Sequence, residues 1–161
     1  LHYEKGKPKQ GFYALQHLTS IFDGALSPSN NIQTEFDILD EGSFPGISSE
    51  NNKEYLKQNP PYKDAKSPYP IEVVALSGNE GDAVTYWLPW RMQEYIKPGK
   101  INLFIEDVNI QYPVLVDLLT GDIYRPKTEN RNKGMLFKDV LLTDYPMAIV
   151  PQHLVKMKSE D

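Results

Sequence analysis

Apolar and polar side chains alternate along much of the chain, as they do in β-strands that bury one face. Between residues 112 and 124 this alternation, with Val114, Val116 and Leu118 on one side, predicts two strands that reverse over a Thr-Gly turn. Gly121 supplies the positive φ that a tight hairpin requires. The segment therefore predicts a β-hairpin with one buried face.

The same period of two predicts about eight strands in all. In residues 32–38, Ile32, Thr34, Phe36 and Ile38 alternate with polar side chains. The other predicted strands are residues 71–76, 83–88, 100–106, 114–118, 122–125, 135–141 and 147–150, with a charged loop at 127–134. Short strands at this spacing favour an antiparallel sandwich or an open barrel, and of the two we predict a mostly-β sandwich.

A second pattern, with a spacing of three and four residues, predicts one helix near the N-terminus. Its apolar stripe consists of Phe12, Leu15, Leu18, Ile21 and Phe22. Pro8 suits the first turn of this helix and Gly24 suits its C-terminal cap. The stripe is wide for a lone helix beside a sheet, so it packs either on this domain or on a partner.

These patterns divide the chain into three parts. Residues 1–26 hold the predicted helix, residues 27–151 form the sandwich, and residues 152–161 form a polar tail that is expected to fray. Within the sandwich, residues 40–70 are rich in Pro, Gly, Ser and Asn, a composition that cannot sustain a strand ladder. We predict a long surface excursion there.

Composition narrows the partners. The 161 residues suffice for one domain with a real core, and 17 basic against 22 acidic side chains give a net charge of −5 without any basic block. Nucleic acid and membrane are therefore not expected as partners. No apolar run has the roughly 20 residues that cross a bilayer. The chain begins at Leu1 without an initiator Met or a signal pattern, and we expect an excised piece of a longer polypeptide.

Motifs for catalysis, metals or cofactors are weak or missing in the sequence. His2, His17 and His153 lie far apart, and there is no cysteine, nucleophile elbow, phosphate loop or dinucleotide fingerprint. The segments at residues 40–42 and 79–82 are predicted to be solvated turns rather than calcium loops. Asp37, Asp107, Asp117 and Asp144 fall at strand edges or turns, where Asp usually caps backbone N–H groups. We expect no catalytic residue, metal or cofactor.

Aromatic residues provide the best candidates for ligand contact. Trp90 and Tyr95 follow the run Tyr86-Trp87-Leu88-Pro89 and could form a platform on which a sugar ring stacks. The competing interpretation is core packing, which we favour more strongly for Trp87 than for Trp90.

Three local patterns resemble the C-terminal part of multidomain glycoside hydrolases of the TIM-barrel type. Residues 7–24, with Tyr13-Ala-Leu-Gln16 and Phe22-Asp-Gly24, are similar to the last barrel helix of those enzymes. Residues 84–89 are similar to a Tyr-Trp strand of the β-sandwich that follows the barrel. Residues 113–124 and 142–150 are similar to the closing strands of that sandwich.

The resemblance implies a non-catalytic accessory domain that packs against and stabilises a catalytic barrel outside this chain, with the helix stripe facing the barrel. It also implies carbohydrate as a further candidate partner, and an extracellular or periplasmic location. Two alternatives stay open: an independent carbohydrate-binding module, and a cell-surface adhesion-type sandwich without an attached enzyme.

Overall fold

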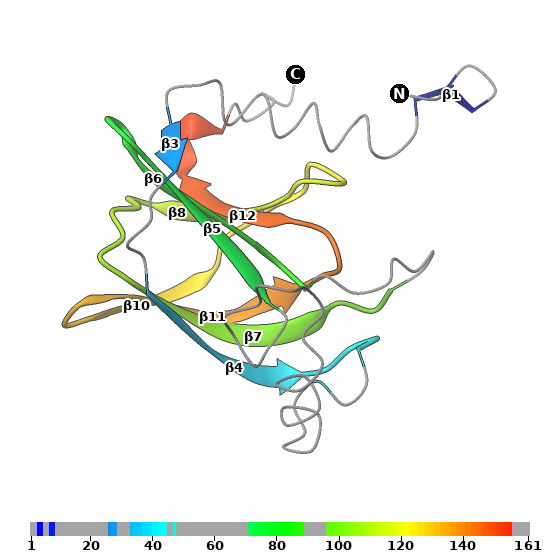
Figure 1. Ribbon diagram of the computed structural model, residues 1–161, viewed down its shortest axis with the longest axis horizontal. Coiled ribbons are helices and arrows are strands. Elements are labelled where there is room, and N and C mark those ends of the chain that lie inside the picture. The colour runs from blue at the N-terminus through cyan, green and yellow to red at the C-terminus, as the bar shows by residue number, and fades with distance from the viewer. Residues whose placement is uncertain are drawn as a thin grey trace.

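The computed structural model describes residues 3–4, 7–8, 26–28, 33–44, 47, 71–88 and 96–155. Within these residues the chain forms two antiparallel sheets that pack face to face (Figure 1). The predicted mostly-β sandwich architecture is therefore confirmed. The helix predicted at residues 12–22 lies outside the described residues.

The smaller sheet has four strands in the order β10-β11-β7-β4. Its members are β4 (Thr34–Asp40), β7 (Gly99–Glu106), β10 (Lys127–Arg131) and β11 (Gly134–Leu142). The alternation predicted around β4 is present, because Phe36 and Ile38 pack against the core while Glu35 and Asp37 are exposed.

The larger sheet has six strands in the order β3-β5-β6-β12-β8-β9. They are β3 (Leu26–Pro28), β5 (Glu72–Gly78), β6 (Gly81–Trp87), β8 (Pro113–Asp117), β9 (Ile123–Tyr124) and β12 (Met147–Pro151). The predicted hairpin is the β8–β9 pair, in which Leu115 lies opposite Tyr124 and Gly121 has a φ of 82°. Two further short strands, β1 (Tyr3–Glu4) and β2 (Lys7–Pro8), pair with each other.

The main core lies between the two sheets. Both contribute fully buried side chains, among them Leu103 and Phe137 from the smaller sheet and Tyr86 and Ile149 from the larger one. The Tyr86 hydroxyl donates a hydrogen bond of 2.6 Å to the carbonyl oxygen of Leu141, which joins β6 to β11 across the core. Trp87, predicted to be buried, is only half-buried.

The prediction of a charged loop at residues 127–134 is wrong, because residues 127–131 form strand β10. This strand pairs with β11 from Lys127 opposite Lys138 to Arg131 opposite Gly134. It is the edge of the smaller sheet, where backbone hydrogen bonds suffice and polar side chains are the usual composition.

The surface excursion predicted at residues 40–70 has buried side chains near its start. Phe44 and Ile47 are 0% and 1% exposed and belong to the main core. The Ser43 N–H donates to the carbonyl oxygen of Lys97 at 2.9 Å, which holds this segment against the residues before β7. The rest of the predicted excursion, residues 45–46 and 48–70, lies outside the described residues.

The first residues of the polar tail predicted at residues 152–161 have a defined structure. Residues Gln152–Leu154 form a 3₁₀ helix, and the Gln152 N–H donates to the carbonyl oxygen of Tyr112 at 3.1 Å. The Val155 N–H donates to the carbonyl oxygen of Gln152. These contacts extend the sandwich to Val155.

Candidate functional site

Strands β6, β12 and β8 of the larger sheet carry buried apolar side chains on both faces. In β8 and β12, Leu115, Met147 and Ile149 belong to the core between the sheets, and the residues that alternate with them point the other way. On that second face lies a cluster of side chains that are 0 to 3% exposed, which we call the outer apolar cluster: Ala83, Val114, Val116, Leu118, Ala148 and Val150. Among the described residues, half-buried Val155 also packs against this cluster.

This finding corrects the prediction of a single buried face for residues 112–124, since Val114, Leu115 and Val116 are all buried. A solvated outer face would have been polar at alternate positions. Strands that read as continuous apolar runs are typical of sheets with a covering layer on each side. With side chains only 0 to 3% exposed, the outer face of the larger sheet is buried as completely as the core between the sheets.

Asp117 is a buried carboxylate with a structural role. One of its oxygens, Oδ1, accepts hydrogen bonds from the N–H groups of Leu119 and Thr120 at 2.9 and 3.0 Å, and Oδ2 accepts one from the Tyr145 hydroxyl at 2.7 Å. The side chain is enclosed, since Asp117 is only 4% exposed. As predicted, this Asp satisfies the backbone of its own turn, and it ties that turn to the segment before β12.

The partner of Asp117 is Tyr145, whose hydroxyl keeps its proton at neutral pH. The pKa of Tyr145 is raised above its ordinary value, first by burial and then by the hydrogen bond to Asp117. Because the phenol stays protonated at neutral pH, it acts as a donor to the carboxylate. The pair is therefore built to stabilise the turn.

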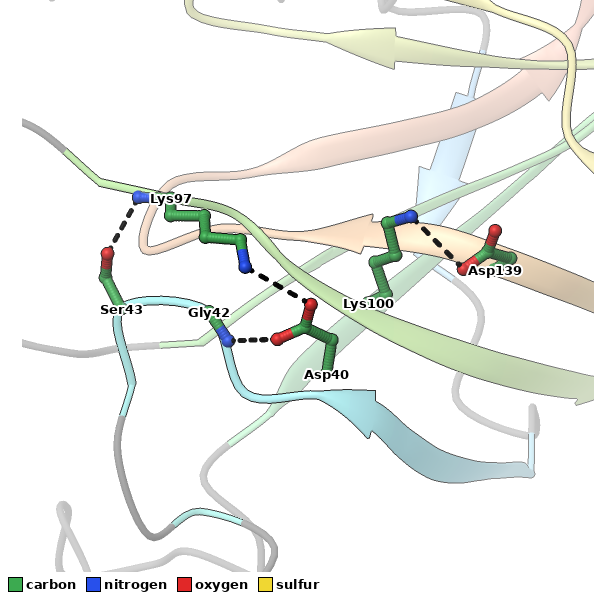
Figure 2. A network of polar contacts seen from close by, with 6 residues as sticks. All are labelled: Asp40, Gly42, Ser43, Lys97, Lys100 and Asp139. Atoms are coloured by element: carbon green, nitrogen blue, oxygen red, sulfur yellow. Dashed lines mark hydrogen bonds and ion pairs between the residues drawn. The ribbon is translucent and has the colours of Figure 1, made fainter.

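A second polar network ties the end of β4 to the residues around β7 (Figure 2). Asp40 Oδ1 accepts a hydrogen bond from the Gly42 N–H at 2.9 Å, and its Oδ2 lies 3.5 Å from Lys97 Nζ. Together these two groups, the N–H first, lower the pKa of Asp40. The Ser43 hydroxyl oxygen accepts from the Lys97 N–H at 2.7 Å. The turn predicted at residues 40–42 is confirmed, and these contacts hold the loop after β4 against Lys97.

A hollow of about 480 Å³ lies where β8 begins and β12 ends. It is lined by Gln111, Tyr112, Gln152, His153 and Val155. Tyr112 is 80% exposed and has a φ of 49°, which is costly for a bulky residue in front of a proline. Strained residues of this kind often occur at binding sites. An exposed ring among amide and imidazole side chains suits a sugar, whose C–H face stacks while its hydroxyls form hydrogen bonds.

Several residues singled out from the sequence cannot be placed in this arrangement. The proposed platform of Trp90 and Tyr95, and the helix stripe with Leu18 at its centre, lie outside the described residues, as do His2 and His17. His153 is exposed and lines the hollow beside Tyr112. Sequence reasoning missed Tyr112, whose only signal was its position before Pro113 at the start of a strand.

The described residues contain no group of three or more His, Cys, Asp or Glu side chains placed to hold a metal ion. No helix in this part of the chain is long and apolar enough to cross a membrane.

No protein family, curated protein or solved structure shows a significant match to this chain.

Proposed function

We propose that this chain is a non-catalytic accessory β-sandwich domain of a glycoside hydrolase. Its role is to pack against a catalytic barrel that lies outside this chain and to hold that barrel in a fixed, stabilised relation to the sandwich. The resemblance of residues 7–24, 84–89, 113–124 and 142–150 to such enzymes motivates the proposal.

The observation that carries most weight is the outer apolar cluster. A two-layer sandwich needs only the core between its sheets, yet the larger sheet presents a second apolar face on β6, β8 and β12. Burying such a face contributes about 25 cal/mol for each Å² removed from water, and its side chains are already only 0 to 3% exposed within this chain. A sheet that is apolar on both sides is suited to a three-layer assembly, in which a further layer covers the second face.

The predicted N-terminal helix supplies a reason for that further layer. Its stripe, from Phe12 to Phe22, spans about half of the helix circumference. In our proposal the part of the stripe around Leu18 faces the barrel, and the helix lies between the barrel and the sandwich. Contacts of this kind between domains of one chain typically bury 600 to 1,500 Å².

The contacts of two carboxylates, buried Asp117 and partly exposed Asp40, also support a non-catalytic role. Glycoside hydrolysis generally needs two carboxyl groups that flank the scissile bond. Asp117 is occupied by two backbone N–H groups and a phenol. Asp40 is held by Gly42 and Lys97 at a loop.

The test compares this chain with the longer polypeptide that extends it at the N-terminus. We expect the longer polypeptide to hydrolyse aryl glycosides and the 161 residues alone to show no hydrolysis above background. Measured turnover by the isolated 161 residues, abolished by substitution of one of its own carboxylates, would refute the proposal. An upstream region without alternating strand and helix patterns would favour the adhesion-type sandwich instead.

A second candidate function, carbohydrate binding by the domain itself, is favoured by the hollow at Tyr112. Its exposed ring is the feature that the predicted platform of Trp90 and Tyr95 was meant to supply. Titration with neutral oligosaccharides, followed by NMR shifts of the residues around Tyr112, tests this. We expect Tyr112→Ala to abolish a saturable shift and Tyr112→Phe to keep it, because the ring and not the hydroxyl does the stacking.

A further inference from the structure

A cleft of about 280 Å³ opens where the chain crosses from β9 of the larger sheet to β10 of the smaller one. Its apolar lining comes from Leu115, Pro126, Val140 and Leu141, and Tyr124 lines it as well. Around it stand four cationic side chains and one carboxylate, namely Lys100, Arg125, Lys127, Lys138 and Asp139. The chain as a whole is acidic, with a net charge of −5, so this concentration of positive charge is local.

Two of these cations lie opposite each other on neighbouring strands. Lys127 on β10 lies directly opposite Lys138 on β11, and like charges in this position repel. Lys138 pairs with Glu129, whose carboxylate also accepts from Arg131 Nε at 3.2 Å. No carboxylate of the described residues lies within 4 Å of Lys127 Nζ. An anion between the two strands would relieve the repulsion.

The single acidic group of the cleft compensates little of this charge. Asp139 Oδ1 lies 3.8 Å from Lys100 Nζ, and both side chains are 47% exposed (Figure 2). An exposed pair at that distance is weak. Asp139 sits in a bulge of β11, with a φ of 56°, and its N–H donates to Asn102 Oδ1 at 3.0 Å. Bulges redirect side chains and are frequent beside binding sites.

Arg125 connects the cleft with the hollow at Tyr112. Its Nη1 donates a hydrogen bond of 3.2 Å to Gln152 Oε1, and Gln152 lines that hollow. The remaining guanidinium N–H groups match the geometry of a carboxylate, which they can bind through two parallel hydrogen bonds. This hydrogen bond places the cleft next to the hollow that the exposed Tyr112 ring lines.

We propose that the cleft binds the acidic group of an anionic oligosaccharide, with Arg125, Lys127 and Lys138 as its ligands and a neighbouring sugar on Tyr112. The assignment of a sugar rests on the proposed function, whereas the assignment of negative charge rests on the cleft alone. Carboxylate and sulfate groups share this chemistry, and the experiment separates them.

The experiment is a calorimetric titration of the 161-residue chain at low and at physiological ionic strength. The ligands are a tetramer of galacturonic acid, a sulfated and a neutral tetrasaccharide of the same length, and tetraglutamate. We expect the uronate to bind saturably, more weakly at higher salt, and the neutral sugar to bind much more weakly. The sulfated sugar should bind if charge alone selects the ligand, and poorly if the guanidinium fork selects a carboxylate; either outcome supports an acidic oligosaccharide.

Variants identify the site. Lys127→Gln and Arg125→Gln should each weaken uronate binding about tenfold, the effect of losing roughly 1.4 kcal/mol. Lys133→Gln, which removes an exposed lysine that does not line the cleft, should leave binding unchanged. Absence of binding by every anion, or equal losses in Lys133→Gln and Lys127→Gln, would overturn the proposal. Tetraglutamate binding as tightly as the uronate would overturn the sugar assignment. None of these results alters the hydrolysis test, so failure of the cleft and failure of the accessory role are distinguishable.

Discussion

Replacement of Asp117 by alanine tests whether this buried carboxylate is structural. The substitution leaves three donors without their acceptor, the N–H groups of Leu119 and Thr120 and the hydroxyl of Tyr145. Hydrogen bonds to charged groups contribute about 1.5 to 3 kcal/mol each, and a buried donor left unsatisfied costs about 1 to 3 kcal/mol. The turn can relax and admit water, so the three losses do not add in full. We expect Asp117→Ala to lower the free energy of unfolding by about 3 to 5 kcal/mol.

Two milder variants divide this loss between the turn and the phenol. Asp117→Asn keeps an oxygen for the two backbone N–H groups, and we expect it to cost about 1 to 2 kcal/mol. Tyr145→Phe removes one donor while leaving the carboxylate in its turn, and should cost about 1 kcal/mol. Asp122→Ala, on an exposed side chain of the same hairpin, is the matched control and should change stability by less than about 0.5 kcal/mol.

The assay is urea unfolding at neutral pH, followed by circular dichroism, for the native chain and the four variants. A double-mutant cycle between Asp117 and Tyr145 isolates their hydrogen bond. A cost below about 1 kcal/mol for Asp117→Ala would refute the reasoning. The carboxylate would then be dispensable for the fold and free for another role.

Three further predictions concern the fold and its dependence on pH. Tyr86→Phe leaves the Leu141 carbonyl oxygen without its donor in the core, and urea unfolding should show a loss of about 1 to 2 kcal/mol. Gly134→Ala places a Cβ against the backbone oxygen of Ile105, so we expect loss of β10–β11 pairing, visible as lost amide protection in hydrogen exchange. The pKa of Asp40 is lowered on folding, so its stabilisation is complete above the unfolded-state pKa, near the ordinary 3.8, and is lost as pH falls through the folded-state pKa. Asp40→Asn should therefore flatten the acid limb of stability against pH, and an unchanged acid limb would contradict the assignment.

The strand pattern was predictable from the sequence wherever one face of a strand is polar. Phe36 and Ile38 alternate with exposed side chains, and the turn at Gly121 carries its own glycine signal. Residues that are neighbours in the sequence determine such elements, so these elements can be predicted from the sequence. The role of Asp117 as a capping residue was predictable for the same reason.

Features that depend on distant parts of the chain could not be predicted. Strand β10 has no apolar face, and it is a strand only because β11 provides backbone partners. Phe44 lies in a proline-rich segment, yet the fold carries it into the core. The second buried face could not be predicted because the alternation of Val114, Val116 and Leu118 indicates one buried side, whereas Leu115 on the opposite side is buried too.

The cleft between β9 and β10 also could not be predicted from the sequence. Its cations come from three separate segments, around Lys100, Arg125 and Lys138, and none of these segments forms a basic block. Only the antiparallel register that sets Lys127 opposite Lys138, and the crossing from β9 to β10, bring them together.

The central claim, that this sandwich stabilises a neighbouring barrel through an apolar contact, is tested most directly by scanning calorimetry of the longer polypeptide. The account predicts one cooperative transition for the whole, and a lower melting temperature for the upstream region once the 161 residues are removed. A shift of about 2 to 4 °C corresponds to each kcal/mol of lost stabilisation in a domain of 150 to 250 residues. Two independent transitions, with the upstream region melting at the same temperature with and without the sandwich, would contradict the claim.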